Sequence, residues 1–274
     1  MADLDLSDVD LAARYDEISD PQFAHGRDLI DLLALTPHDR VVDIGCGTGR
    51  LAALAASHLE KGRVVGIDPD PSRIDVAQRR CTQKLEFRVG HAEDLSAFKP
   101  EKFDAAYMNS VFNWLRDPSR ALVETHRVLK RGGRLGIATT LRDRPNELWH
   151  VVRQARDVAS GLAPEEIAGR TARRNAKKGV SSVEVGELLQ RAAFEIRFFE
   201  RRTYLSSFES AAQIFDFLLA STHGDLIPGA THADRERFRA ALELVIAQLV
   251  PERRRRSGIQ LERHVLLAVA DRVV

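Results

Sequence analysis

The chain has 274 residues, of which 44% are hydrophobic and 30% charged, a composition that suits a globular protein with a sizeable core. Its 41 basic and 40 acidic residues nearly cancel, so no overall charge attracts it to nucleic acid or to a membrane surface. No run approaches the ~20 apolar residues needed to cross a bilayer, and the acidic start lacks the apolar core of a secretory signal. Cys46 and Cys81 are the only cysteines and have no metal-ligand spacing. We therefore expect a cytoplasmic protein with reduced thiols, no metal site, and no nucleic-acid or membrane partner.

The first half of the chain alternates short apolar runs with amphipathic stretches. The apolar runs at 41–45, 63–68, 85–89, 103–108 and 134–139 read as five buried strands. Helical patterns lie near 50–60, 71–82 and 118–130, with a shorter link at 91–102. In the last helix, Asp117 can cap the start, Pro118 suits the first turn, and Gly132-Gly133 can end it. Alternation of strand and helix predicts an α/β protein with a parallel, doubly wound sheet.

After residue 140 the pattern changes. A helix near 145–160 is followed by a cluster of cations, and then by a helix near 183–192 and a strand near 194–205. The cations are Arg170, Arg173, Arg174, Lys177 and Lys178. Ser206 and Glu209 have capping-box spacing and predict a helix over 207–220. A helix near 231–249, the run Arg253–Arg256 and a final strand at 264–270 complete the chain. One domain with an insertion is the simplest organisation.

The most informative segment is the glycine-rich stretch that follows the first strand. Asp43 is followed by Gly45, Gly47 and Gly49, a D-x-G-x-G-x-G pattern in which a strand ends and a helix begins. Glycine permits a sharp turn and close approach of a ligand, while free amides at the helix start can face a polar group. Nineteen residues beyond Gly49, Asp68 ends the second strand, where a carboxylate can accept both ribose hydroxyls of an adenosine.

The spacing separates this loop from two other nucleotide-binding loops. A dinucleotide fingerprint, G-x-G-x-x-G, would place its third glycine at position 50, which is Arg50. A phosphate-binding P-loop would end in Gly-Lys-Ser/Thr, which is also missing. A nicotinamide oxidoreductase is therefore disfavoured, and a tight strand–helix turn without any ligand is the remaining alternative.

The pattern resembles the first motif of class I S-adenosylmethionine-dependent methyltransferases. That resemblance implies a Rossmann-like, doubly wound sheet of seven strands with the last strand antiparallel, and a helical cap insertion. It also implies four segments: an N-terminal lid (1–40), a cofactor-binding core (41–140), a cap with a return strand (141–220), and a C-terminal helix with the final strand (221–274). S-adenosylmethionine is the implied cofactor. The residues implied to bind it are Asp43, Gly45, Gly47, Thr48, Gly49, Asp68, Pro69, His91, Ala92, Glu93 and Asn109.

This chain departs from the family pattern at two of the quoted positions. Many relatives carry Asp or Asn where this chain has His91, so the backbone amide of Ala92 is the alternative contact to adenine. The turn before the fifth strand, Val128-Leu-Lys-Arg-Gly-Gly, matches the family's V-L-K-P-G-G except that Arg131 replaces proline.

A narrower resemblance concerns the methyl acceptor. The stretch Asn109–Trp114 is similar to the N-x-x-x-Q-W of trans-aconitate and malonyl-ACP O-methyltransferases, with Asn113 in place of Gln. It implies a small-molecule acceptor, favours a carboxylate, and leaves a carrier protein open as a partner. A carboxylate is ionised at pH 7 and needs no general base, only donors such as Arg142, Arg144 or the 170–178 cations to align it.

Other acceptors and roles stay open at this point. Methylation of a hydroxyl, thiol or amine would make a base useful, but none of His91, His126 and His150 is singled out by its spacing. The catalytic residue is therefore unknown. Further substrate-side candidates are Tyr15, Phe23, Asn113 and Trp114. N-, S-, C- or hydroxyl-methylation of a secondary metabolite is the alternative reaction, and a cofactor-binding module without turnover is the alternative from another class.

Overall fold

The computed structural model describes residues 8–161, 179–222, 231–249, 254–255 and 258–273. The contacts divide the chain into two compact units, each built from three segments. The sheet unit comprises Gln22–Asp143, Gly179–Arg202 and Val265–Val274, and the helical unit comprises Met1–Pro21, Arg144–Lys178 and Thr203–His264. The whole of the expected core, 41–140, belongs to the sheet unit. The expected N-terminal segment, 1–40, is shared between the two units, and its role as a lid stays a prediction.

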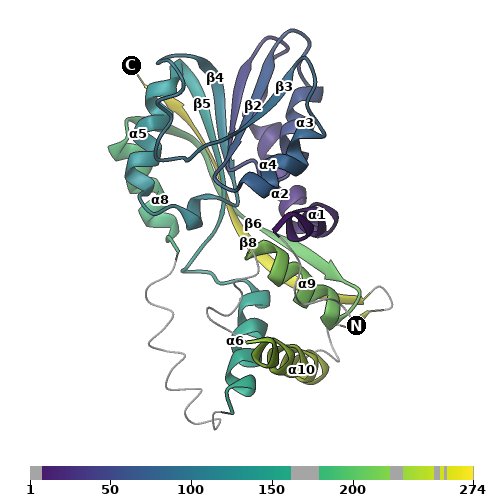
Figure 1. Ribbon diagram of the computed structural model, residues 1–274. Helices are drawn as coiled ribbons and strands as arrows, with labels where there is room; N and C mark the ends of the chain where they lie inside the picture. The colour runs from purple at the N-terminus through teal and green to yellow at the C-terminus, as the bar shows by residue number, and fades with distance from the viewer. Residues whose placement is uncertain (1–7, 162–178, 223–230, 250–253, 256–257, 274) are drawn as a thin grey trace. The chain divides into compact units, whose positions relative to one another are not determined.

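The sheet has the predicted topology. Its strands are β1 (Arg40–Ile44), β2 (Arg63–Asp68), β3 (Leu85–Val89), β4 (Phe103–Asn109), β5 (Leu129–Thr140), β6 (Phe194–Phe208), the short β7 (Arg254–Arg255) and β8 (Gly258–Arg272). Seven of them follow the order β3-β2-β1-β4-β5-β8-β6, and β7 pairs with β8 (Figure 1). Strands β1 to β5 are parallel, whereas β8 runs antiparallel to β5 from Arg134↔Asp271 to Thr140↔Val265. The prediction of a seven-stranded, doubly wound sheet with an antiparallel last strand is confirmed.

Helices cover both faces of the sheet within this unit. They are α2 (Asp20–Leu33), α3 (Arg50–Ser57), α4 (Pro71–Gln78), the 3-10 turn η1 (Phe112–Trp114), α5 (Pro118–Val128) and α8 (Ser182–Arg191). Leu135 and Ile137 of β5 share a core cluster with residues of α5 and α8. A Cβ built on Gly136, between them, would lie 3.1 Å from side-chain atoms of Leu29 and Leu33 on α2. Alternate residues of one strand therefore contact helices on opposite faces, as a doubly wound sheet requires.

Two of the predicted helix boundaries are wrong, each for a local reason. Helix α5 ends at Val128, not at Gly132-Gly133, and β5 begins at once. The glycine pair instead lies in an irregularity of the β4–β5 pairing, between Phe103↔Leu129 and Ala105↔Arg134. Helix α9 (Ala211–Ser221) begins after Ser210, whose side chain accepts from the Gln213 amide. The Ser206–Glu209 capping box does not form, because β6 continues to Phe208.

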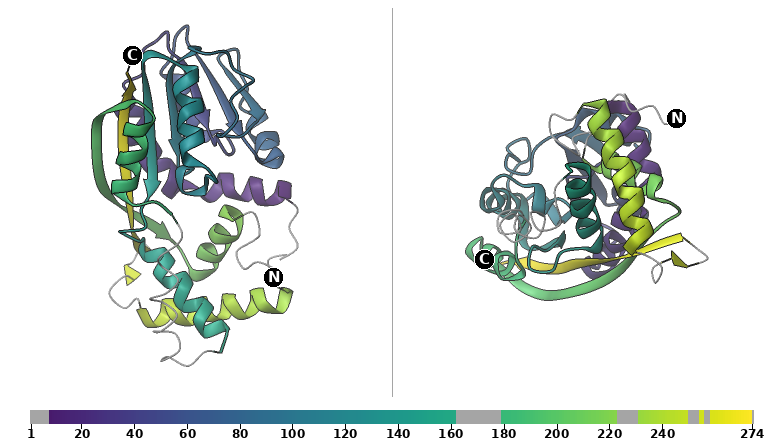
Figure 2. Two further views of the ribbon diagram at one scale, coloured as in Figure 1. Left: turned by 90° about the vertical axis from the view of Figure 1, so that its left-hand side faces the viewer. Right: turned by 90° about the horizontal axis from the view of Figure 1, so that it is seen from below.

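The helical unit has its own core. Its helices are α1 (Asp8–Ile18), α6 (Glu147–Ala159), α9 and α10 (His232–Leu249), and Figure 2 shows α6 and α10 crossing side by side. Buried residues of these helices, among them Leu148, Val152, Phe215, Leu218 and Phe238, form one apolar cluster. The cation cluster 170–178 lies outside the described residues. Within the described chain, no helix combines the length and apolar character that crossing a membrane requires.

Candidate functional site

The glycine loop connects β1 to α3 and is sterically confined to glycine. Gly45, Gly47 and Gly49 all have left-handed backbones, with φ of 76°, 54° and 81°. A Cβ on Gly45 would lie 2.2 Å from Val111 Cγ2, and one on Gly49 would lie 2.4 Å from Phe87 Cζ. The amides of Gly45 and Cys46 both donate to the Ile67 carbonyl of β2, at 2.7 and 2.9 Å. The loop is therefore fixed against the end of β2, and the side chains of Val111 and Phe87 occupy the space that side chains at positions 45 and 49 would need.

Asp68 links this loop to the end of β2. One carboxylate oxygen accepts from the Gly47 amide at 2.9 Å and the other from the Asp70 amide at 3.0 Å. The Asp68 residue is only 6% exposed. An ionised carboxylate has about four lone-pair sites, so these two bonds leave acceptor capacity for ligand hydroxyls. The glycine loop and the acid at the end of the second strand, which the sequence predicts to lie in one site, are thus joined by a hydrogen bond.

Asp43, also predicted for this site, lies near the end of β1, just before the loop. Its carboxyl is 1% exposed and accepts from the Tyr107 hydroxyl at 2.8 Å. Burial raises the pKa of Asp43 to about 8, partly offset by the Tyr107 hydrogen bond and increased by the nearby Asp68 charge. Burial also raises the pKa of Tyr107 well above its ordinary value. The side chain of Asp43 thus contacts Tyr107 on β4 and joins the two strands next to the loop.

The segment after β3 forms a tight turn. His91 and Asp94 form an isolated bridge, His91 is exposed, and Ala92 is buried. Glu93 makes two hydrogen bonds within the chain. Its carboxylate accepts from the Arg116 amide at 3.0 Å, and its carbonyl accepts from Arg120 Nε at 2.8 Å. Pro69, the other predicted residue at this edge, is exposed. The turn is thereby tied to the chain that leads into α5.

A buried polar cluster at the end of β4 was not predicted as a whole. Asn109 Nδ2 donates to the Gln22 carbonyl at 3.1 Å, which fixes the orientation of the Asn109 amide. Asn109 Oδ1 and Gln22 Oε1 are both buried and have no hydrogen-bond partner among the described residues. Beside them, His25 is fully buried and its Nε2 lies 3.0 Å from Ser110 Oγ. Ser110 has a left-handed backbone, with φ of 61°, which non-glycine residues rarely adopt.

One sequence signal could have revealed this cluster. Gln22, His25, Gly26, Leu29 and Leu33 lie on the buried side of α2, so two polar residues occupy an otherwise apolar stripe. Polar side chains at such positions need partners, which here come from the end of β4.

The substrate-side candidates do not all belong to one unit. In the sheet unit, the Arg50 guanidinium lies 4.7 Å from the centre of the Phe23 ring, and η1 contains both Asn113 and Trp114. Trp114 is 59% exposed. Arg142 donates to the Gly179 carbonyl at 3.0 Å and to Glu184 at 2.8 Å, so its guanidinium already serves the chain's own structure. Tyr15 on α1 and the exposed Arg144 belong to the helical unit.

The three histidines considered from sequence lie in different surroundings. His91 is in the exposed turn after β3, and His126 on α5 contacts the Phe194 ring at 5.4 Å. His150 is on α6 in the helical unit. Burial lowers the pKa of both His126 and His150. His25, which was not among them, is the histidine that contacts the end of β4. Among the described residues, no group of three or more His, Cys, Asp or Glu side chains could hold a metal.

Comparison with known proteins identifies the same segment. Residues 42–137 match the family model described as a methyltransferase domain. The chain is 32% identical to trans-aconitate 2-methyltransferase of Deinococcus radiodurans over 45% of this chain and 46% of that protein. It is 31% identical to malonyl-[acyl-carrier protein] O-methyltransferase of Hahella chejuensis over 57% of each chain. These alignments thus span about half the length of the curated relatives.

Solved structures share the fold over most of the chain. A putative methyltransferase from Bacillus halodurans has a TM-score of 0.61 at 16% identity, covering 92% of this chain and 100% of that one. Geranyl diphosphate C-methyltransferase from Streptomyces coelicolor, solved with S-adenosyl-L-homocysteine, has a TM-score of 0.53 at 19% identity and covers 91% and 76%. At these identities the likeness concerns the fold alone.

Proposed function

Residues 42–137 form a class I S-adenosylmethionine-dependent methyltransferase domain, and from this premise we propose that the protein methylates a carboxylate oxygen of a small molecule. S-adenosylmethionine is the cofactor of this domain. The carboxylate is proposed because the names of two relatives, trans-aconitate and malonyl-[acyl-carrier protein] methyltransferase, both denote carboxylic acids. The observation that carries the assignment of the site is the hydrogen bond between Asp68 and the Gly47 amide.

The residues at the carboxyl ends of β1, β2 and β4 fit this cofactor. The three glycines give the loop a left-handed backbone that other residues rarely adopt, and Asp68 keeps acceptor capacity for ribose hydroxyls. Asn109 Oδ1 and Gln22 Oε1 are buried acceptors that lack donors, and a bound ammonium group would supply them. Thr48, Pro69, His91, Ala92 and Glu93 complete the proposed cofactor-binding set. Asp43 acts in it indirectly, since it accepts the Tyr107 hydrogen bond that joins the end of β1 to β4.

The chain's own part in the reaction is alignment and exclusion of water. When bound, the cofactor would supply a methyl group attached to a positively charged sulfur. A nucleophile attacks that methyl group in line, and the sulfur leaves as a neutral thioether. A carboxylate is already ionised, so the protein must place it without protonating it. Phe23, Asn113 and Trp114, which all belong to the sheet unit, are the proposed acceptor contacts. Tyr15 and Arg144 belong to the helical unit, and their role stays a prediction. Arg142, the remaining predicted contact, donates to the Glu184 carboxylate and the Gly179 carbonyl, so only its other donors are offered to an acceptor.

The His25–Ser110 pair favours a second candidate, methylation of a group that must lose a proton. The buried imidazole of His25, at hydrogen-bond distance from the Ser110 hydroxyl, can serve as a general base. A carboxylate acceptor, which is already ionised, would not need one. A hydroxyl, thiol or amine acceptor would then show a rate that rises with pH through the titration of the base. A carboxylate acceptor would show a flat profile near neutrality.

The decisive experiment uses methyl-labelled S-adenosylmethionine with simple di- and tricarboxylic acids, carrier-bound malonyl thioester and a pooled small-molecule extract. After the reaction, alkali releases label as methanol from methyl esters and leaves ethers, amines and thioethers intact. An alkali-labile product would confirm carboxylate methylation. An alkali-stable product would refute it and support the second candidate. Cofactor binding without transfer to any acceptor indicates a module that binds but does not turn over.

Cofactor binding tests the site independently of the acceptor. Asp68→Ala and Gly47→Val should each sharply weaken S-adenosylmethionine binding measured by calorimetry. Asp75→Ala, at an exposed acid on α4, is the matched control and should bind as the wild type does. Wild-type affinity in the first two variants would refute the assignment of this loop.

A further inference from the structure

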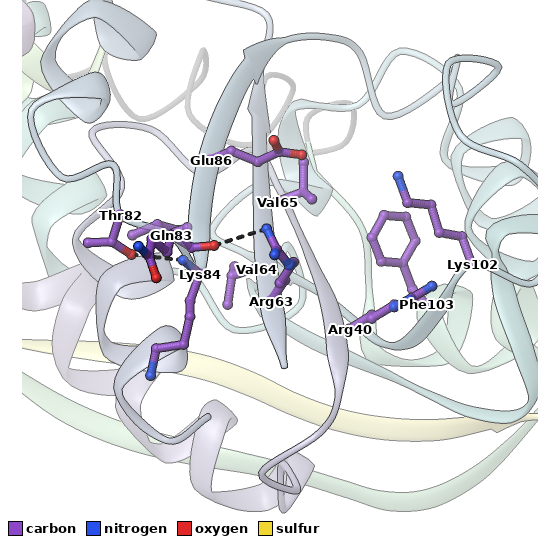
Figure 3. Close-up of a pocket in the computed structure, with 11 residues that line it drawn as sticks. Arg40, Arg63, Val64, Val65, Thr82, Gln83, Lys84, Glu86, Lys102 and Phe103 are labelled. Atoms are coloured by element: carbon purple, nitrogen blue, oxygen red, sulfur yellow. Dashed lines mark hydrogen bonds between the residues drawn. The ribbon is translucent and has the colours of Figure 1, made fainter. Parts of the chain in front are cut away.

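A cavity lies at the opposite end of the parallel strands from the glycine loop. It has a volume of about 190 Å³ and lies at the amino ends of the parallel strands (Figure 3). Liquid water occupies about 30 Å³ per molecule, so the cavity has room for a small ion and part of its hydration shell. We call it the amino-edge cavity, and eleven residues line it.

The amino-edge cavity collects cations because a basic residue stands at the start of each of four strands. Arg40 and Arg63 are the first residues of β1 and β2, and Lys84 and Lys102 directly precede β3 and β4. The strand order β3-β2-β1-β4 places these four positions in one row. Arg40 and Arg63 are direct neighbours in the β1–β2 register. Like charges at neighbouring positions repel, so this arrangement is unfavourable without a counter-ion.

Three of the four cations remain available to the cavity. Lys84 donates its ammonium to the Leu59 carbonyl at 2.5 Å, and Figure 3 shows its side chain directed away from the others. Arg63 donates one nitrogen to the Gln83 carbonyl at 3.0 Å and has further donors. Lys102 lies 4.8 and 5.3 Å from the ring centres of Phe98 and Phe103. The side chain of Arg40 makes no hydrogen bond or ion pair to any residue in the described ranges.

The acids near these cations also pair with other basic residues. Glu86, which lines the cavity, pairs with Arg88 at 2.9 Å. Asp104 accepts from the Arg40 amide at 2.8 Å and from Lys130 Nζ at 2.5 Å. Burial, with the charges of Arg88 and Arg40, lowers the pKa of Lys102 despite the opposing effect of Glu86. With four cations and one acid among its lining residues, the cavity carries an excess of positive charge.

From the row of strand-start cations and the cavity between them, we infer that the amino-edge cavity binds a phosphoryl group through Arg40, Arg63 and Lys102. A doubly charged oxyanion matches a cavity lined by three available cations better than a single carboxylate does. The two guanidinium groups offer forked donors and the ammonium a point charge. The apolar lining residues Val64, Val65 and Phe103 are nearly fully buried and offer little surface to a larger ligand. The source is inorganic phosphate or a small phosphate ester, and this binding does not depend on the proposed methyl transfer.

Calorimetric titration at low ionic strength tests this inference with two probes, inorganic phosphate and ribose 5-phosphate. The wild type should bind one equivalent saturably, and Arg40→Gln and Lys102→Gln should each weaken binding by about fivefold or more. Arg191→Gln, at an exposed cation of α8 in the same unit, is the matched control and should not change it. Tighter binding of the ester would identify a phosphorylated metabolite as the source, and equal binding would identify free phosphate.

Two further readouts make the result unambiguous. Amide chemical shifts should change at residues 40, 63 and 102 when phosphate is added. Absence of saturable binding, equal weakening by Arg191→Gln, or shift changes confined to other regions would overturn the inference. S-adenosylmethionine affinity, measured on the same variants, should stay at the wild-type value. A protein that binds phosphate here but no S-adenosylmethionine would refute the proposed function and leave this site standing.

Discussion

The buried Asp43 carboxyl makes the stability of the sheet unit depend on pH in a way that a single substitution should remove. Burial raises the pKa of Asp43 from an ordinary 3.8 to about 8 in the folded protein. Between these values the folded state binds a proton that the unfolded state has released. The free energy of unfolding contributed by this group is therefore highest below pH 4 and falls as the pH rises toward 8.

Asp43→Asn keeps the shape of the side chain and an oxygen that accepts from Tyr107, but it cannot ionise in either state. One proton corresponds to about 1.4 kcal/mol per pH unit, so the wild type should lose about 2.7 kcal/mol relative to the variant between pH 5 and pH 7. All other titrating groups are common to both proteins, and their effects largely cancel in the difference. The variant should thus become progressively more stable than the wild type as the pH rises.

Urea unfolding at pH 5, 6 and 7, followed by pulsed hydrogen exchange in peptides from β1 and β4, reads the unit that contains Asp43. Asp75→Asn, at an exposed acid on α4, is the control and should give a difference that does not change with pH. Tyr107→Phe should keep the slope, since Asp43 is still present, while losing about 1–3 kcal/mol from the missing hydroxyl. A difference between Asp43→Asn and wild type that is the same at pH 5 and pH 7 would mean that Asp43 is ionised when folded, and the reasoning would fail.

Three further experiments test separate parts of the structure. Gly49→Ala should lower the free energy of unfolding in urea by about 2–5 kcal/mol, because the strain of a left-handed backbone adds to a clash with Phe87. Gly132→Ala has the backbone strain but open space around its Cβ, and it should cost about 1–2 kcal/mol. Equal losses would contradict the clash. Arg142→Gln should speed hydrogen exchange in α8 because Glu184 loses its partner, and S-adenosylmethionine affinity should not change. The Ser181 amide and Arg142 lower the pKa of Glu184 to about 2. The stability contributed by this carboxylate is therefore present above pH 4.5 and is lost as the pH falls toward 2. In Arg142→Gln this contribution should be smaller. Arg40→Gln should raise the free energy of unfolding by about 0.2–1 kcal/mol in phosphate-free buffer, since a like-charge pair disappears, and a loss would contradict that repulsion.

The sheet could be predicted from sequence because its signals are local. Five apolar runs of strand length, separated by helical patterns, leave few arrangements other than a parallel doubly wound sheet. The glycine loop and Asp68 could be placed for the same reason, as each directly follows one of these strands. The boundaries that failed were those where two local signals competed. Ser206 and Glu209 have helix-start spacing, but strand pairing continues through Phe208, and Ser210 caps the helix instead.

The polar cluster at the end of β4 could not be assembled from local patterns, since its members are far apart in the chain. His25 and Ser110 are separated by 85 positions, and Gln22 and Asn109 by 87. Each looks unremarkable alone: a polar residue on an amphipathic helix, or a residue after a strand. Their meeting depends on α2 packing against the face of the sheet that Gly136 leaves open, a tertiary contact without a signal of its own.

The packing of α2 also bears on how the site is prepared for a ligand. Gly26 lies where a Cβ would be 2.8 Å from a Leu51 side-chain atom and 2.9 Å from Asn109 Nδ2, so the helix approaches both the loop helix α3 and the end of β4. This close approach brings the Gln22 carbonyl to Asn109 and leaves two buried oxygens without donors. Unsatisfied buried acceptors cost about 1–3 kcal/mol each, a cost that a ligand with N–H donors would remove. Cofactor binding is therefore expected to stabilise α2 against hydrogen exchange, and Gly26→Ala to weaken that effect by displacing the helix.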